Sequence, residues 1–353
     1  MSINHKQLTF AREYRGLTQS ELAKKIMGLS QPNLSKFEKG LGTLSDEVMM
    51  RVIDYLKFPI GFYERKVYNV IENAHYRTKS INKSQRSNIE YSAKLIGYTI
   101  DEMANSVEFP EMRIAQINIE EGYTPTTIAQ YTRKYMNLKD EPVKNICSLL
   151  EDYGVIIVEF DCDVDSFDGV SFSTDAGYYV MVINKNFSND RKRFTIAHEL
   201  GHIIMHLSSD FIIPDLRDKE KEAHEFASEF LMPSDCIYRS LLNLKSSSLV
   251  ELKRYWLTSM GSIVKRAADL KAINKDRYTN LFIELSRKGF RKNEPIDVFI
   301  DSPSLFKDAY LLHKNELGYS DKELALSFNL PADVIERFFY PKKIKMRVLR
   351  QNA

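Results

Sequence analysis

The stretch from Arg193 to His206, RFTIAHELGHIIMH, decides the fold and the chemistry expected of the chain, because it contains the pattern H-E-x-x-H as His198, Glu199 and His202. Residues four apart lie on one face of a helix, so both imidazoles can converge on a single metal ion. Two histidines leave room for a third protein ligand and a water, as in catalytic zinc sites. Glu199 is placed to take a proton from that water and pass it to a leaving amine.

The third metal ligand has to come from outside this helix. His206 lies eight residues after His198, roughly 12 Å further along the helix axis, too far for both to bind one ion, so we interpret it as a neighbour of the ligands or as a structural residue. Downstream, EKEAHEFASEFLMP begins at Glu220, which shares a helix face with His224. We predict Glu220 as the ligand and His224 as a group that orients a metal-bound side chain, with Glu222 and His224 itself as alternative ligands.

Four motifs together resemble one protein family. They are AHELGH at 197–202, the pattern E-x-x-A-x-x-F-A-x-x-F-L-M-P from residue 220, DGV at 168–170 and RKRF at 191–194. This combination is similar to the ImmA/IrrE family of bacterial and phage zinc metallopeptidases. The resemblance implies a small zincin-like fold akin to thermolysin-like enzymes, and a role in cutting helix-turn-helix repressors.

The resemblance also assigns roles to residues. The family's zinc ligands fall on His198, His202 and Glu220, with Glu199 as the general base and one zinc ion (Zn2+) per chain. The sequence departs from the family at His224, where Asn or Asp is more frequent.

Composition sets the class of protein. The 353 residues are 43% hydrophobic and 28% charged, as in a soluble globular protein of two or three domains. No run approaches the roughly 20 apolar residues that span a bilayer, and MSINHKQLTF is too polar for a signal peptide, so we expect a cytoplasmic protein without a membrane partner. Cys147, Cys162 and Cys236 are too scattered for a disulfide framework and are expected to be reduced structural thiols.

The N-terminal region reads as a bundle of short helices. Thr18 and Glu21 form the pattern of a capping box, and Ser30 can cap the next helix just before Pro32. The patterns T-Q-x-E-L-A and S-Q-x-x-L-S-K-x-E-x-G, which begin at these two caps, resemble XRE/Cro/C1-type helix-turn-helix domains. Two departures are an extra residue in the turn and the proline itself.

In such domains the third helix lies in the major groove of DNA, and it begins here at about Gln31. The candidates for base contacts are Gln31, Asn33, Ser35 and Lys36, and Gln31 could pair with adenine. Gln19 and Lys39 are better placed for phosphates. The alternative is a helix-turn-helix fold that serves only as a dimer or partner interface.

The middle of the chain alternates helices with two strands. A helix over 87–107 carries an apolar stripe that is typical of a core or of a homodimer surface. Helices are expected over 128–136 and 142–152, and strands over 154–160 and 177–184. We hypothesise that 170–184 forms a sheet edge that pairs with an extended substrate. An ordinary internal hairpin is the alternative.

The C-terminal region contains an internal echo of the N-terminal one. The stretch YSDKELALSFNLPADVIERFF at 319–339 parallels LTQSELAKKIMGLSQPNLSKF at 17–37, and a basic tail follows. The echo indicates either a second, degenerate helix-turn-helix or a packing hairpin with a solvated tail.

The sequence therefore predicts a mainly helical α+β protein. Its expected parts are an all-α helix-turn-helix bundle over 1–66, a helical connector over 67–121, a zincin-like metallopeptidase domain over 122–295 and a helical region over 296–353. The predicted function is a regulatory zinc endopeptidase that cleaves a partner protein and binds DNA. The alternative is a transcription factor or antitoxin-like binding module with a structural or sensing zinc site, in which Glu199 has no role.

Overall fold

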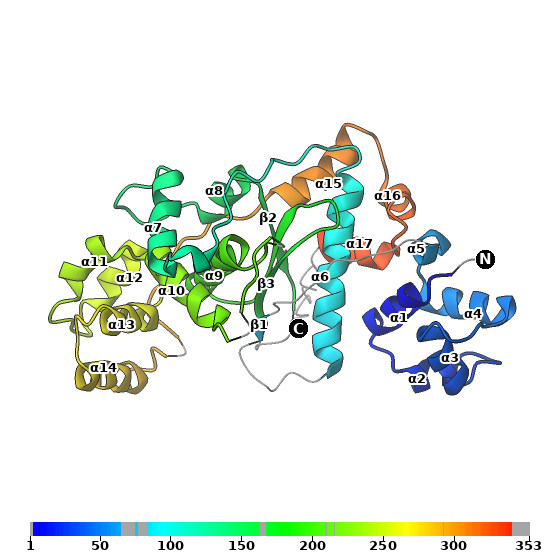
Figure 1. Ribbon diagram of the computed structural model, residues 1–353, viewed down its shortest axis with the longest axis horizontal. Helices are drawn as coiled ribbons and strands as arrows, with labels where there is room; N and C mark the ends of the chain where they lie inside the picture. Colours follow the sequence, from blue (N-terminus) through cyan, green and yellow to red (C-terminus); the bar gives the residue numbers. More distant parts are fainter. Residues whose placement is uncertain are drawn as a thin grey trace, which may run out of the picture. The chain divides into compact units, whose positions relative to one another are not determined.

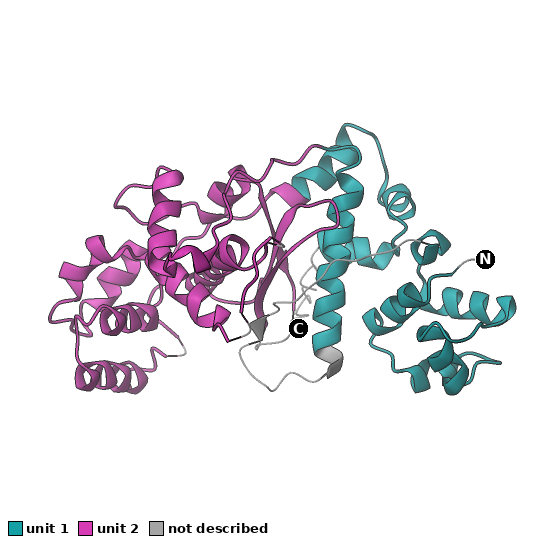
Figure 2. Cartoon of the chain, in the orientation of Figure 1, with its two compact units in different colours: residues 1–68, 83–107, 307–353 teal, residues 69–82, 108–306 magenta. Residues whose placement is uncertain are grey.

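The computed structural model describes residues 3–64, 75–76, 83–162, 167–208, 210–214, 216–291 and 293–340. The chain folds into two compact units (Figure 2): unit 1 comprises 1–68, 83–107 and 307–353, and unit 2 comprises 69–82 and 108–306. Helices predominate beside one small sheet (Figure 1), so the predicted mainly helical α+β class is confirmed. The predicted basic tail lies outside the described residues.

Unit 1 begins with the predicted bundle of short helices, α1 (His5–Tyr14), α2 (Gln19–Lys25), α3 (Gln31–Glu38), α4 (Asp46–Leu56) and α5 (Ile60–Glu64). The Thr18 hydroxyl accepts a hydrogen bond from the Glu21 amide while the Glu21 carboxylate accepts from the Thr18 amide, so the capping box is present. The Ser30 hydroxyl caps α3 in the same way. Fully buried apolar side chains hold these helices together: Leu8, Leu22, Leu34, Val52, Leu56 and Phe62.

The long helix α6 (Lys83–Met103) packs against α1 in unit 1. Its apolar stripe is core, since Ile89, Ala93, Ile96, Ile100 and Met103 are at most 2% exposed. The last predicted member, Val107, lies beyond the end of α6 and is half-buried.

Three C-terminal helices complete unit 1, namely α15 (Leu305–Asn315), α16 (Asp321–Ser327) and α17 (Ala332–Phe339). Ser320 and Glu323 repeat the capping box of α2. Two polar side chains of α17 pair with other residues of unit 1. The Asp333 carboxylate lies 2.5 Å from Arg15, and Arg337 donates to Ser92 at 3.3 Å and to Asn88 at 3.2 Å. These contacts favour the packing hairpin among the two predicted alternatives.

The sheet of unit 2 has the order β1-β3-β4-β2, with β1 (His75–Tyr76), β2 (Val155–Phe160), β3 (Phe167–Ser173) and β4 (Tyr179–Asn184). The strands β2 and β4 are parallel, and the other pairs are antiparallel. Because β4 lies inside the sheet, it cannot be the predicted substrate edge. The side of β3 away from β4 pairs with β1 at Phe167 and Gly169, so a substrate edge stays a prediction for residues 170–173 of β3.

Helices of unit 2 pack against this sheet. Helix α9 (Asn189–Met205) lies between the sheet and α10 (Lys219–Leu231), and α10 also contacts α7 (Pro125–Tyr135), as Figure 1 shows. The others are α8 (Ile146–Asp152), α11 (Ser234–Leu241), α12 (Leu249–Trp256), α13 (Met260–Asp269), α14 (Lys275–Arg287) and the 3-10 turn η1 (Ile119–Glu121). No helix in the described part of the chain has the length and apolar content needed to cross a membrane.

Two residues of the H-E-x-x-H helix fix its place in the core. A Cβ on Gly201 would lie 3.1 Å from the Phe226 ring and 3.3 Å from the Ala223 Cα, so the glycine lets α9 and α10 approach closely. Arg193 is fully buried and donates to the backbone oxygens of Val143, Lys144 and Phe299. Burial lowers the pKa of Arg193 to about 10.

Candidate metal centre and nucleic-acid interface

Three side chains from α9 and α10 converge as the sequence predicts for a metal site. The Nε2 atoms of His198 and His202 lie 3.1 Å apart, and each lies 3.6 Å from an oxygen of Glu220. The helical spacing of four residues puts both imidazoles on one face of α9, while Glu220 stands in the first turn of α10, opposite them. This group could hold a metal ion.

A chain of polar contacts begins at the Nδ1 atom of His202, on the side of the ring away from the metal-binding group. This Nδ1 atom lies 2.9 Å from Nδ1 of His206, whose Nε2 atom lies 2.9 Å from Glu222. Burial holds the pKa of His206 below its usual range. A neutral His206 that donates to Glu222 accepts the Nδ1 proton of His202, which leaves the Nε2 lone pair of His202 available to a metal ion.

Arg217 extends this chain to η1. It donates to Glu222 at 2.7 Å and also pairs with Glu120. The structure therefore places Glu222, an alternative ligand in the sequence analysis, against His206 and Arg217 rather than in the metal-binding group. Sequence reasoning missed Arg217 and Glu120, because 97 residues separate them and no motif joins them.

Glu199, the candidate general base, is fully buried beside β3. The Ser171 hydroxyl donates a hydrogen bond of 2.7 Å to its Oε2 atom. A Cβ on Gly169 would lie 2.7 Å from the Thr195 Cγ2 and 3.4 Å from Glu199 Oε1, so the glycine of the DGV motif gives α9 the space it needs. The neighbouring Asp168 pairs with Arg191 at 2.6 Å. Sequence reasoning missed Ser171.

His224 lies one turn after Glu220 on α10. Its Nε2 atom is 2.9 Å from the Lys265 ammonium, its Nδ1 atom is 3.5 Å from the Ser228 hydroxyl, and its ring centroid is 4.8 Å from that of Phe194. These contacts place His224 on the side of α10 that faces α13. Its predicted role in orienting a metal-bound side chain stays a prediction.

A cleft of about 1220 Å3 opens beside this group. His198, Glu199 and Glu220 line one part of it, while side chains of α13, of α14 and of described residues that follow α14 line another. The cleft is large enough for several residues of an extended peptide.

The helix-turn-helix residues singled out for DNA lie at the surface. Gln31, Asn33, Lys36 and Lys39 are exposed, and Ser35 and Gln19 are half-buried. The Gln31 amide donates to Gln19 at 2.9 Å, and the Gln19 amide donates to Glu38 at 2.7 Å. Glu38 is itself held by Arg12 at 2.6 Å, so a fixed polar chain sets the orientation of Gln31.

An H-E-x-x-H helix packed on a small mixed sheet, with a carboxylate supplied by the next helix, defines a metallopeptidase-like domain. Residues 150–268 match the family model of the IrrE N-terminal-like domain, Peptidase_M78, and residues 10–63 match the Helix-turn-helix model. The chain thus carries an IrrE N-terminal-like domain and an N-terminal helix-turn-helix domain of XRE type, as the resemblances predicted. A comparison with curated proteins finds no match.

Proposed function

We propose that the chain is a regulatory zinc endopeptidase that cleaves a partner protein, and that the partner is a helix-turn-helix transcriptional repressor. The observation that carries this proposal is the convergence of His198, His202 and Glu220 beside the buried carboxylate of Glu199. In this proposal the N-terminal domain targets the peptidase through DNA.

The spacing of the three ligand side chains supports zinc as the metal. A tetrahedral zinc ion about 2.05 Å from each ligand atom separates those atoms by roughly 3.4 Å. The three separations here are 3.1, 3.6 and 3.6 Å, which lie on both sides of that value. Two imidazoles and one carboxylate are also the ligand set of thermolysin-like catalytic sites, which keep a fourth position open.

The chemistry follows from the side chains around that position. When bound, a zinc ion lowers the pKa of a water and polarises the scissile carbonyl. Glu199 accepts the proton of the attacking water and returns it to the leaving amine. Ser171 holds one oxygen of Glu199 by a hydrogen bond, which fixes the plane of the carboxylate. The cleft beside the base accommodates the substrate chain.

The substrate class rests on two features of the chain. The resemblance to ImmA/IrrE peptidases implies that helix-turn-helix repressors are cut, and the IrrE N-terminal-like domain is here joined to a helix-turn-helix domain. A peptidase that binds near the same operators as its target would meet that target at a high effective concentration.

A second candidate function is a DNA-binding or antitoxin-like module in which the metal is structural or sensing. The fixed polar chain from Arg12 to Gln31 favours it, because it presents the Gln31 amide in one orientation at the surface of α3. Such a module has no use for a carboxylate beside the first ligand. Glu199→Gln therefore distinguishes the two candidates.

The test compares new protein N-termini in host cells that express either the wild type or Glu199→Gln at equal levels, with the zinc content of both proteins measured. Cuts that appear only with the wild type, inside a helix-turn-helix protein, support the proposal and name the substrate. Identical N-termini in both cells, with zinc bound to both proteins, contradict it and favour the binding module.

A further inference from the structure

Among the described residues, six lysine and arginine side chains line the cleft beside the metal centre. Four of these have a carboxylate partner within 4 Å: Arg191 with Asp168, Lys253 with Asp190, Arg266 with Glu229 and Lys221 with Glu225. Lys265 and Arg291 form no ion pair within the part of the chain that the structure describes. Of the cleft's described residues, these two are therefore the cations that a ligand could pair with.

Lys265 is the better candidate of the two because neighbouring groups fix its position. Its ammonium lies 2.9 Å from His224 Nε2, and a lysine has only donors, so the histidine accepts this hydrogen bond. Phe194 packs against the other side of the histidine ring, at 4.8 Å between centroids. Lys265 is half-buried, and among the described residues its ammonium donates to no acceptor outside the His224 ring, so its other N–H groups can meet a ligand.

The position of Lys265 along the cleft is set by α10. His224 stands four residues after Glu220, one helical turn or roughly 6 Å along the axis. A substrate chain held at the metal centre would therefore pass Lys265 within a few residues of the bond that is cut. At that distance the charge acts on a side chain close to the scissile peptide.

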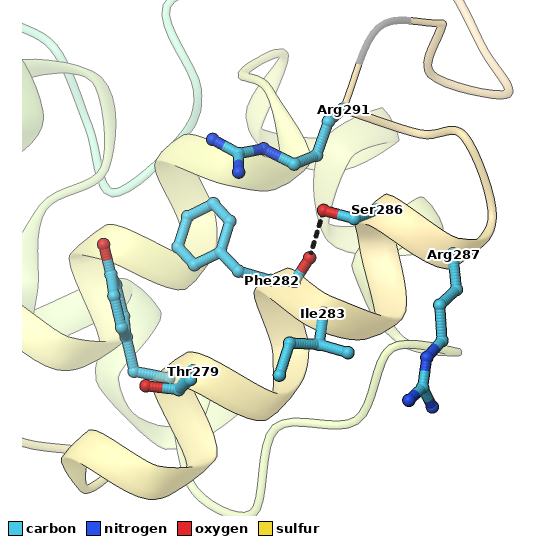
Figure 3. A pocket seen from close by; sticks show the side chains of 7 residues that line it. Thr279, Phe282, Ile283, Ser286, Arg287 and Arg291 are labelled. Atoms are coloured by element: carbon cyan, nitrogen blue, oxygen red, sulfur yellow. Dashed lines mark hydrogen bonds between the residues drawn. The ribbon is translucent and has the colours of Figure 1, made fainter.

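Arg291 stands in a different setting. Its guanidinium lies 5.3 Å from the centroid of the Phe282 ring, and both residues also border a separate hollow of about 450 Å3 on α14 (Figure 3). Arg291 is exposed and rests on an aromatic ring, whereas Lys265 is held by a histidine next to the metal-binding helix. The two cations are thus not equivalent, and the inference concerns Lys265.

We propose that Lys265, held in place by His224, is a subsite for a carboxylate side chain of the substrate, so that the peptidase prefers an aspartate or glutamate close to the bond that it cuts. This inference rests on the proposed endopeptidase function. Its physical basis is that a half-buried lysine with no ion pair among the described residues stabilises an incoming anion and disfavours a cation at the same place.

The experiment maps cleavage preference with a mixed peptide library and the zinc-loaded full chain. Four proteins are compared: the wild type, Lys265→Met, Lys265→Glu and the control Lys245→Glu, which makes the same charge change at an exposed lysine that does not line the cleft. We expect the wild type to enrich Asp and Glu at one position near the cut by about tenfold, as for charge-assisted contacts. Lys265→Met should lose this enrichment, and Lys265→Glu should favour Lys and Arg there instead.

A second readout does not depend on turnover. A labelled peptide with Glu at the selected position should bind the inactive Glu199→Gln protein about tenfold more tightly than its Gln counterpart, and Lys265→Met in that protein should abolish the difference. An unchanged preference in Lys265→Glu, with wild-type zinc content and melting temperature, overturns the inference and leaves the endopeptidase intact. If the wild type makes no cuts beyond those made by Glu199→Gln, the proposed function is contradicted, and this inference is contradicted with it.

Discussion

The Ser171 hydroxyl donates a hydrogen bond of 2.7 Å to the Glu199 carboxylate, and both side chains are fully buried. This bond joins β3 to the H-E-x-x-H helix at the residue that we propose as the general base. We expect Ser171→Ala to lower kcat about tenfold with little change in KM, because the carboxylate loses its fixed plane while the peptide-binding cleft is unchanged.

The measurement for Ser171→Ala is steady-state cleavage of the substrate found by N-terminal mapping. Zinc content and melting temperature serve as controls for folding. If KM rises while kcat stays constant, the hydroxyl supports the cleft rather than the base.

Gly169 illustrates how closely the strand and the helix approach. A Cβ there would lie 2.7 Å from the Thr195 Cγ2, so Gly169→Ala should destabilise unit 2 by about 1–3 kcal/mol. Thr195→Ser removes that methyl group, and the double variant should recover much of the lost stability. Gly261→Ala is the matched control, since its Cβ would meet atoms no closer than 3.8 Å. Unfolding in urea gives the free energy of unfolding of all four variants. If the double variant loses as much stability as Gly169→Ala, the steric cause is refuted.

The polar chain behind His202 predicts an effect on metal affinity. Glu222→Gln weakens the acceptor that holds His206, and such outer contacts typically change metal affinity 10–100-fold. We expect the Kd for zinc to rise by about tenfold in a chelator competition. Glu225→Gln, on the same helix and half exposed, should leave the Kd unchanged. Equal effects of both variants would assign the change to net charge instead.

The sequence predicts most of the metal centre because its residues are local. Two histidines four residues apart need only a helix to converge, and α9 supplies it. The assignment of Glu220 as the third ligand needed the family resemblance as well, because spacing alone left Glu222 as an alternative ligand. The groups behind the ligands escaped prediction for a physical reason: Ser171 meets Glu199 across 28 residues, and that pairing is set by packing between a strand and a helix, which no periodicity encodes.

The C-terminal helices were likewise predictable in their local structure but not in their packing. The parallel between residues 319–339 and 17–37 indicated their helical rhythm from the sequence. Their packing in unit 1 depends on contacts such as Arg337 with Asn88, across 249 residues, which sequence patterns do not reveal.

These contacts predict that the C-terminal helices stabilise the helix-turn-helix unit. Arg337→Ala removes the hydrogen bonds to Asn88 and Ser92, and we expect a loss of about 1–3 kcal/mol, that is about 0.5–1.5 kcal/mol for each bond. Asp333→Asn, at an exposed ion pair with Arg15, should cost less than about 1 kcal/mol. Hydrogen exchange of amides in α1 and α6 measures both, and faster exchange should follow Arg337→Ala alone. Equal protection in both variants would mean that α17 does not stabilise the unit.

The surface of α3 gives the last prediction, which separates base recognition from phosphate contact. The Gln31 amide is oriented by Gln19, so Gln31→Ala should relax the preference at one base pair by about 1–3 kcal/mol. Lys39→Ala, at an exposed residue expected to contact phosphate, should weaken binding to all sequences alike and reduce the salt slope by about one. Lys322→Ala removes the same charge from α16, whose helix-turn-helix partner α17 is engaged inside unit 1, and should change neither quantity. Binding titrations across a salt series on a selected DNA site measure these effects. A smaller salt slope in Lys322→Ala would show that the C-terminal echo also contacts DNA, and an unaltered base preference in Gln31→Ala would remove α3 as the reading helix.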